Sequence, residues 1–464
     1  MTEPDWTSLL PPLLAIVLAI ATRRVVSSLL GGIWLGQSLL LGTWNPLVGL
    51  AAALDAIVAV FAGAGDARVL LFMLLVGSAI AVMERGGGVG AFVALLERRR
   101  WVDGPARAQW LAWGTGLVIF IESTVTLLVA GALARPLFDR FRLARARLAY
   151  LIDATSAPVC MLIPANAWGA LNLGLLENAG VDGAVGVLLA AIPLNFYALA
   201  AVVLAAISIR TGLALGPMRA ADAAAAAATI EAATMGAAPA EGDALEAGRA
   251  RVMVVPILAL VLTVPVALWI TGEGDFTAGS GSVAVLWAVL AALASAWLLS
   301  AREGVRGVEL AEAATTGAGR MLPVTLLLLL AFTLGDVAGA LGTGPYLAGL
   351  LGASLPAWLL PGVIFIVAAF TAFSIGSSFG TFALIVPLAM AVAEPLGLSA
   401  PLLLAAVLSG GVFGDHASPI SHTTVVASLA AGVEHIEHVR TQLPYALLAG
   451  GFALACFLLA GLFS

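Results

Sequence analysis

Long apolar runs recur along this chain, and several approach the roughly 20 residues that an α-helix needs to cross about 30 Å of hydrocarbon. They lie near residues 9–22, 184–209, 252–271, 282–300 and 443–463. Charged side chains make up 10% of the 464 residues, whereas soluble domains carry about 25%. The sequence therefore predicts an all-α polytopic membrane protein with the lipid bilayer as its surroundings, and it excludes a soluble domain.

An alanine-rich, low-complexity stretch at residues 210–251 divides the chain nearly in half and is predicted to be a cytoplasmic linker. The apolar segments on its two sides follow the same order, which is the sequence sign of internal repeats in transporters. Residues 1–209 and 252–464 are therefore predicted to be two repeats. Each repeat contains two apolar segments that small and polar residues interrupt, and these four segments are residues 105–136, 148–176, 357–391 and 400–431.

Arginine placement indicates that the two repeats are inverted. Four arginines between residues 98 and 107 and five between residues 135 and 147 flank the segment 105–136, so both of its ends are predicted to be cytoplasmic. A segment whose two ends lie on one side is a re-entrant hairpin. The flanks of 357–391 contain no arginine, which predicts a second hairpin that enters from the outer side.

The expected fold therefore has about ten transmembrane helices, two re-entrant hairpins, and interrupted helices at 148–176 and 400–431. Both termini are predicted to lie outside the cytoplasmic membrane. This arrangement requires residues 46–65 and 302–319 to be interfacial helices that lie along the membrane surface.

Polar residues gather at the four interruptions, where unpaired backbone groups would cost several kcal/mol each in hydrocarbon. Such breaks persist where they line a cavity or bind a ligand. Carboxylate and hydroxyl oxygens suit hard cations, and the sequence shows no thiolates or grouped imidazoles for softer metals at the breaks. The candidate binding residues are Glu122, Ser123, Thr126, Asp153, Thr155, Ser156, Ser377, Ser378, Asp415, Ser418, Ser421 and Thr423.

The acids among these residues are predicted to carry protons, because burial in the membrane favours the neutral carboxyl unless a cation replaces the proton. Asp415, Asp153 and Glu122 are the expected proton carriers, and sodium is expected at Asp153, Asp415 and the neighbouring hydroxyls. A carboxylate that binds the two ions in turn is the minimal mechanism of cation/proton antiport. No cofactor, transition metal or nucleic acid is expected, and a homodimer stays open.

Three stretches carry a family resemblance: "FIESTVTLLVAGALARPLFDRFRLARARLAYLIDATSAPV", "SSFGTFALIVPLA" and "GDHASPISHTTVVAS". With the opening "LLPPLLAIVLAIATRRVVSSLLGGIWLG", they resemble the NhaC family of sodium/proton antiporters, in the ion transporter superfamily, over most of the chain except the linker. The resemblance implies that the interrupted helices hold the site residues. These are Asp153, Thr155 and Ser156 in the first repeat and Asp415, Ser418, Pro419, Ser421 and Thr423 in the second.

The chain departs from the family pattern at the first hairpin tip, where many members carry paired aspartates and this sequence has Glu122 and Ser123. The change removes one potential negative charge and leaves the stoichiometry and the driving ion open. Some members of the family exchange small carboxylates such as malate and lactate. Carboxylate exchange is therefore the alternative, and Asn166, Asn172 and helix N-termini would supply its hydrogen-bond donors.

The leading hypothesis is exchange of sodium, or lithium, for protons by alternating access, with elevator and rocking motions both open. An intramembrane protease that uses Asp153 and Asp415 is a remote alternative, in which the duplicated hairpins would have no role. The chain is therefore predicted not to be an enzyme. His435 and His438, in the run "HIEH" before the last span, are expected on a solvated face.

Overall fold

The computed structural model describes residues 5–22, 24–88, 91, 104–120, 122–232, 250–275 and 279–463. Every regular element in these ranges is a helix, which confirms the prediction of an all-α fold. Seven of the described helices are long and apolar enough to cross a membrane, and the number rises to nine if each of two bent pairs is one span. The ten crossings remain a prediction. The arginines at 98–100 and linker residues 233–249 lie outside the described residues.

The first half of the chain begins its helices where local sequence favours a start. Pro46 and Pro105 stand in the first turns of α3 and α6, where the N–H that proline lacks would have no helical partner. The elements are η1 (Trp6–Leu9), α1 (Leu10–Thr22), α2 (Val25–Leu40), α3 (Pro46–Ala59), η2 (Val60–Ala62), α4 (Ala64–Arg85), α6 (Pro105–Val118), α7 (Ser123–Arg140), α8 (Arg145–Asp153), α9 (Ala157–Leu162), α10 (Ala167–Asn178), α11 (Ala184–Ala191), η3 (Ile192–Leu194) and α12 (Phe196–Thr211).

The second half begins after α13 (Pro217–Ala232), a helix within the expected linker. Asp222 of α13 pairs with the buried Arg147 of α8, so this part of the linker packs against the body of the protein. The remaining elements are α14 (Arg251–Thr271), α15 (Gly281–Arg302), α16 (Gly307–Ala340), α17 (Thr343–Ser354), η5 (Ala357–Leu359), α18 (Leu360–Ile375), α19 (Ser378–Ala393), α20 (Ala400–Ala417), α21 (His422–Ala431) and α22 (His435–Gly461).

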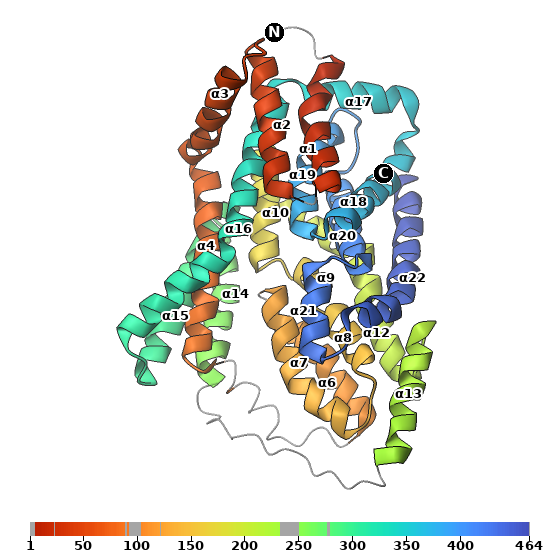
Figure 1. Ribbon diagram of the computed structural model, residues 1–464. Helices are drawn as coiled ribbons and strands as arrows, with labels where there is room; N and C mark the ends of the chain where they lie inside the picture. The colour runs from red at the N-terminus through yellow and green to blue at the C-terminus, as the bar shows by residue number, and fades with distance from the viewer. Residues whose placement is uncertain are drawn as a thin grey trace.

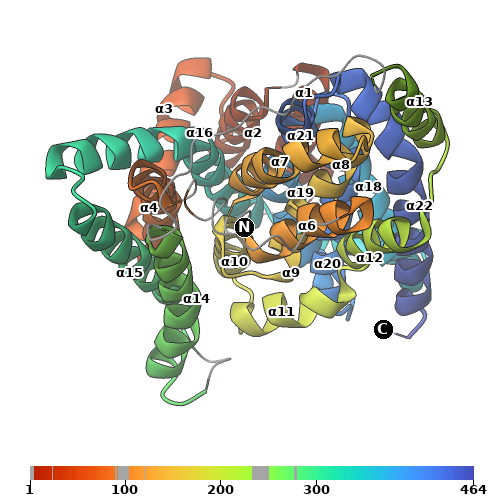
Figure 2. The same cartoon turned by 90° about the horizontal axis from the view of Figure 1, so that it is seen from below.

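The helices form two groups that face each other, as the two perpendicular views show (Figure 1, Figure 2). One group, which we call the scaffold, packs α4, α14, α15 and α16 together with α2. The other, which we call the core, contains α6 to α9, α12 and α18 to α22. Helix α10 lies between the groups and contacts both α4 and α19.

Glycines allow close helix approaches inside each group. In the scaffold, a Cβ at Gly77 of α4 would lie 2.3 Å from the backbone oxygen of Gly317 in α16. In the core, a Cβ at Gly414 of α20 would lie 2.1 Å from the backbone oxygen of Ala369 in α18. Small residues at membrane helix contacts let backbones approach and gain van der Waals packing.

The structure corrects the expectation for residues 302–319, which were predicted to be a separate interfacial helix. Residues 307–340 form one helix of 34 residues, α16, that continues through Pro323. The charges near its start do not force a break because partners satisfy them: Arg306 donates to Glu309 at 2.6 Å, and Arg320 donates to Glu84 at 3.0 Å.

Candidate ion-binding site

Polar side chains cap the N-termini of four helices that follow chain breaks in or beside the core. The side chain of Glu122 accepts a hydrogen bond from the backbone N–H of Val125 at the start of α7, and Ser377 accepts one from Gly380 at the start of α19. Asn166 and Ser421 cap α10 and α21 in the same way. These side chains pair backbone donors that would otherwise be unsatisfied, so polar residues at a break keep it stable in an apolar core.

Gly376, at the tip between α18 and α19, packs closely against the break between α20 and α21. Its φ angle is +67°, in the left-handed region that side chains disfavour. A Cβ at this position would also lie 2.6 Å from the backbone oxygen of Ile420. Both the left-handed backbone and the close contact therefore require glycine at this position. The close contact places Ser377 and Ser378 beside the end of α20.

Asp415, near the end of α20, lies among hydroxyl groups. Its Oδ2 accepts hydrogen bonds from Ser378 Oγ at 3.0 Å and from Thr423 Oγ1 at 3.4 Å. Ser421 Oγ lies 3.0 Å from Thr423 Oγ1, which extends the cluster. The Oδ1 atom of Asp415 is buried and has no hydrogen-bond partner among the described residues. The arrangement is a carboxylate with one free oxygen beside three hydroxyl oxygens.

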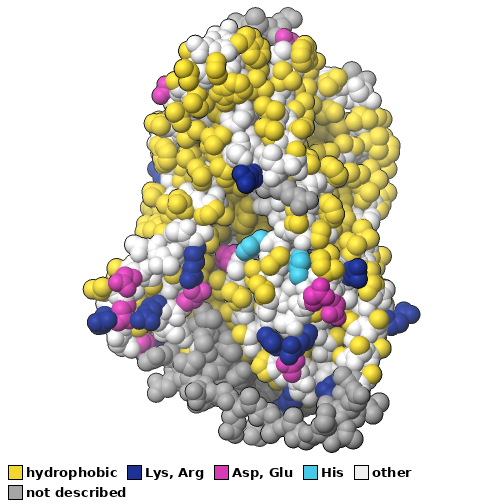
Figure 3. Space-filling view, viewed as in Figure 1, with side chains coloured by type: hydrophobic (Ala, Val, Ile, Leu, Met, Phe, Trp, Pro, Cys, Tyr) yellow, Lys and Arg dark blue, Asp and Glu magenta, His cyan; other side chains and the backbone are white. Residues whose placement is uncertain are grey.

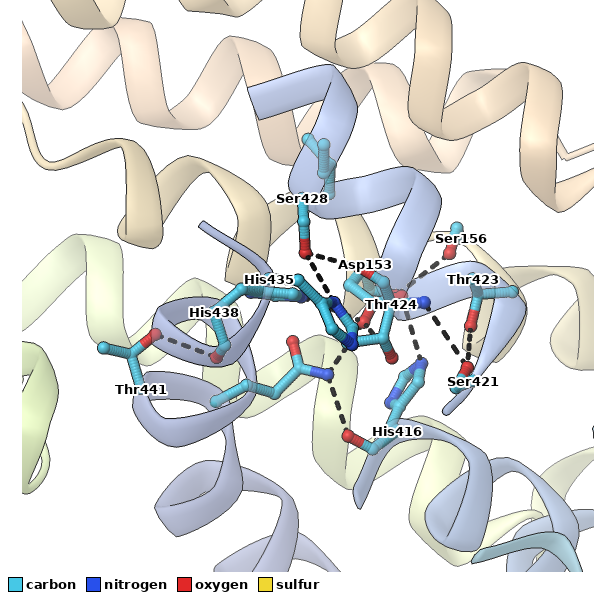
Figure 4. A network of polar contacts seen from close by, with 12 residues as sticks. Asp153, Ser156, His416, Ser421, Thr423, Thr424, Ser428, His435, His438 and Thr441 are labelled. Carbon is cyan, nitrogen blue, oxygen red and sulfur yellow. Dashed lines mark hydrogen bonds and ion pairs between the residues drawn. The ribbon is translucent and has the colours of Figure 1, made fainter. Parts of the chain in front are cut away.

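Asp153, at the end of α8, lies in a different environment of amide and imidazole groups (Figure 4). Its Oδ2 accepts from Gln442 Nε2 at 2.8 Å and from Thr424 Oγ1 at 3.2 Å, and it lies 3.3 Å from His438 Nε2. His416 Nε2 lies 3.8 Å from Oδ1. Asp153 and His438 are fully buried, and the groups that contact Oδ2 come from α21 and α22, whereas Oδ1 has no hydrogen-bond partner among the described residues.

The two acids share one wall. Thr423 and Thr424 are neighbours in the first turn of α21, and the first contacts Asp415 while the second contacts Asp153. Asp415 is likewise followed in the chain by His416, whose Nδ1 lies 3.1 Å from the hydroxyl of Tyr197 on α12. The charges of the two carboxylates therefore interact electrostatically.

A cavity of about 600 Å³ lies between the core and the scaffold. Its core side includes Glu122, Ser378 and Asp415, and its scaffold side includes Glu84 and Arg320. The molecular surface is hollowed between the two groups in the space-filling view, where charged side chains gather in the lower half (Figure 3). The described lining of this cavity does not include Asp153. The structure thus brings Asp415 to the cavity and sets Asp153 behind it.

Four of the sequence-predicted hydroxyls bond to backbone oxygens at the breaks and not to the carboxylate of either aspartate. Thr155 donates to Leu151 at 2.8 Å, and Ser156 donates to the backbone oxygen of Asp153 at 3.0 Å. Ser418 donates to Phe373 at 2.7 Å, and Thr126 donates to the backbone oxygens of Ile119 and Glu122. Ser123 lies on the cavity and contacts the Glu122 carboxylate at 3.3 Å.

Sequence reasoning missed His438, Gln442 and Tyr197, and the structure corrects the expectation that His438 is solvated. His438 is fully buried against Asp153, because α22 runs along the core and its first turns face α8 and α21. The available signal was the spacing of His438, Gln442 and Tyr445, which places them on one face of a helix. No group of three or more His, Cys, Asp or Glu in the described parts of the chain is arranged to hold a metal ion.

Broken helices that carry buried acids beside a cavity, in a chain with seven to nine candidate spans, define a membrane transporter and not an enzyme. A family model described as the Na+/H+ antiporter family matches residues 159–462, and the chain belongs to that family. It is an antiporter.

Related proteins support this assignment at different levels. An uncharacterized protein of Haemophilus influenzae is 32% identical over 467 residues, which cover 95% of this chain and 88% of that protein. Short matches link the chain to the arginine/ornithine antiporter ArcD of Halobacterium salinarum (36% identity, 23% of this chain and 22% of that protein) and to the malate-2H(+)/Na(+)-lactate antiporter of Bacillus subtilis (37% identity, 18% and 19%). The crystal structure of the Alcanivorax borkumensis YdaH transporter has the same fold, with a TM-score of 0.63, 17% identity and 90% of each chain covered.

Proposed function

We propose that this antiporter exchanges sodium for protons across the cytoplasmic membrane by alternating access. The observation that carries the proposal is Asp415, a buried carboxylate on the cavity whose Oδ1 has no partner among the described residues and whose neighbours are hydroxyl oxygens. Carboxylate and hydroxyl oxygens are the ligands that hard cations prefer. Sodium would bind at Asp415 with Ser378, Ser421 and Thr423.

The proton would bind at Asp153 instead. The sequence led us to expect sodium there as well, but Asp153 lies off the cavity and already accepts hydrogen bonds from an amide and a hydroxyl. A carboxylate surrounded by hydrogen-bond donors and imidazoles is better suited to gain and lose a proton than to bind a metal ion. Glu122 would support the hairpin tip as the cap of α7.

Coupling would arise from the wall that the two acids share. A sodium ion at Asp415 adds positive charge near Asp153 and disfavours a proton in its cluster, and release of sodium has the opposite effect. Burial makes the doubly charged, ion-free core costly to move, so the core would move with one ion or the other. Movement of the core against the scaffold would open the cavity to alternate sides.

Transport by the purified protein in lipid vesicles with an internal pH dye tests this function. A sodium gradient should drive proton movement in the opposite direction, lithium should replace sodium in part, and potassium should not. Asp415→Asn should lower the sodium-driven rate by at least about a hundredfold, because losing one charge of a buried site costs roughly 3 kcal/mol or more. A response to malate alone, or full activity of the variant, would contradict the proposal.

A second candidate, exchange of small carboxylates, is favoured by the size of the cavity. About 600 Å³ falls within the usual range for small-molecule sites. Arg320 on the cavity wall is paired with Glu84, and the side-chain amide of Asn166 is occupied by the backbone oxygens of Phe120, Cys160 and Ile163, so cavity size is the observation that favours this candidate. The malate arm of the vesicle experiment separates this candidate from sodium exchange.

A further inference from the structure

We propose that His438 exchanges protons with Asp153, and that protons travel between Asp153 and the surface at which α22 begins, without passing through the cavity that Asp415 lines. The inference rests on the proposed sodium/proton exchange and names the residue and the path for its proton. The juxtaposition that supports it is His438 Nε2, fully buried, at 3.3 Å from Asp153 Oδ2.

His438 is the basic side chain nearest the Asp153 carboxylate. His416 is the other imidazole of the cluster, but its Nε2 is 3.8 Å from Oδ1 and its Nδ1 is engaged with the Tyr197 hydroxyl. The Nδ1 atom of His438 has no hydrogen-bond partner among the described residues. One ring nitrogen of His438 thus faces the acid, and the other is available to pass a proton on.

The path outward follows one face of α22. His435 lies three residues before His438, so the two side chains are neighbours on the helix surface (Figure 4). His435 is partly exposed, with Nε2 at 2.7 Å from the backbone oxygen of Pro419 and Nδ1 at 3.2 Å from Ser428 Oγ. His435 therefore stands between water and the buried pair.

The proton step needs no other reactant. A proton on Asp153 Oδ2 passes to His438 Nε2, which leaves a carboxylate and an imidazolium. The imidazolium then releases its Nδ1 proton to water on the His435 side. The net change is one proton moved from the carboxyl to water, and the reverse sequence reloads the acid.

Several titratable groups surround this pair, and their placement favours His438 as the carrier. Asp415 faces the cavity, and Tyr150 and Tyr197 carry no charge in the working range of pH. Helix α21 contributes hydroxyls to the pair, and its titratable side chain, His422, lines the cavity. The titratable groups on the helices around the pair include Asp153 and Tyr150 from α8, Tyr197 from α12, Asp415 and His416 from α20, His422 from α21, and His435, Glu437 and Tyr445 from α22.

Two measurements on vesicles separate a proton-transfer role from a structural one. The first is sodium-driven proton movement, and the second is exchange of labelled for unlabelled sodium at equal concentrations, which needs no proton. His438→Gln should slow the first by at least about tenfold, since positioned acid–base groups contribute 10² to 10⁴. It should leave the second within about twofold of the wild type, because sodium binding at Asp415 does not use the His438 ring. Thr441→Val is the matched control, because the Thr441 hydroxyl bonds to backbone oxygens of its own helix.

Each result has a defined meaning. Unchanged proton movement in His438→Gln, or equal loss of both activities, would overturn the inference. If His438→Gln does not fold, His435→Gln carries the test, with the same selective slowing expected and an unchanged rate counting against the path. Failure of the wild type to move protons with sodium would overturn the proposed function and this inference together, whereas a normal wild type with an unaffected His438→Gln overturns the inference alone.

Discussion

Two adjacent threonines of α21 contact two different acids. Thr423 and Thr424 differ by one position, and their hydroxyls contact Asp415 and Asp153 respectively. Residues one position apart on a helix point in directions about 100° apart, so the first turn of α21 can contact two sites at once. The separation of an acid that contacts hydroxyls from an acid that contacts an imidazole thus depends on the start of one helix.

At this scale, substitution of Gly376 by any residue with a side chain is expected to destabilise the protein. Gly376→Ala should destabilise the protein by about 1–2 kcal/mol from the left-handed backbone alone, and by more from the approach of the new Cβ to the backbone oxygen of Ile420. Thermal unfolding in detergent measures the change. Gly349→Ala in α17, where a Cβ would meet nothing within 4 Å, is the control and should not lower the melting temperature. Equal melting temperatures for the two variants would argue against the strained tip.

Among the elements, α13 packs the described part of the linker against the core. Arg147 of α8 is buried and pairs with Asp222 of α13, and it also donates to the backbone oxygen of Leu213 at 3.4 Å. Tyr445 of α22 accepts a hydrogen bond from the backbone N–H of Leu215 and stacks on Tyr150 of α8. Helix α13 and the segment just before it therefore contact both α8, which carries Asp153, and α22, which carries His438.

Asp222→Asn should cost on the order of 3 kcal/mol, because it leaves the Arg147 guanidinium buried without its counter-charge. The double variant Arg147→Met with Asp222→Leu should recover most of that loss, since no isolated charge remains. Melting temperatures of the single and double variants give the coupling. Arg306→Gln breaks an exposed pair with Glu309 and serves as the control, with no measurable change expected. A double variant no more stable than the single one would refute this view of α13.

For the whole molecule, the arrangement of charge predicts its orientation in the membrane. The ends of α6, α8 and α13 that carry arginines lie toward the lower end of Figure 1, and both chain termini lie toward the upper end. Cytoplasmic loops are enriched in arginine and lysine. The lower end is therefore expected to face the cytoplasm.

Labelling with a membrane-impermeant thiol reagent tests the orientation, in a variant with Cys160 and Cys456 replaced by alanine. A cysteine added at the C-terminus should be labelled in intact cells. Arg219→Cys, an exposed position on α13, should be labelled only after the membrane is opened. The opposite pattern would reverse the orientation and, with it, the side from which His438 exchanges protons.

The all-α membrane fold was determined by local sequence, because apolar runs of spanning length have few stable alternatives in lipid. The acids Asp153 and Asp415 were also visible, since an intramembrane carboxylate stands out against apolar neighbours. Thr155, Ser156, Ser418 and Thr126 looked equivalent to the other hydroxyls in the sequence. Whether a hydroxyl faces a ligand or its own backbone depends on side-chain direction, which local sequence does not specify.

What the sequence determined by itself was the class of protein and the two acids, since hydropathy and buried charge are properties of a segment and its immediate neighbours. Only the tertiary structure decided that Asp415 faces the cavity while Asp153 is enclosed by His438, Gln442 and Thr424. Those partners lie 271 to 289 positions away in the chain. Contacts over such separations form only when helices pack, and no local pattern encodes which face of α22 meets α8.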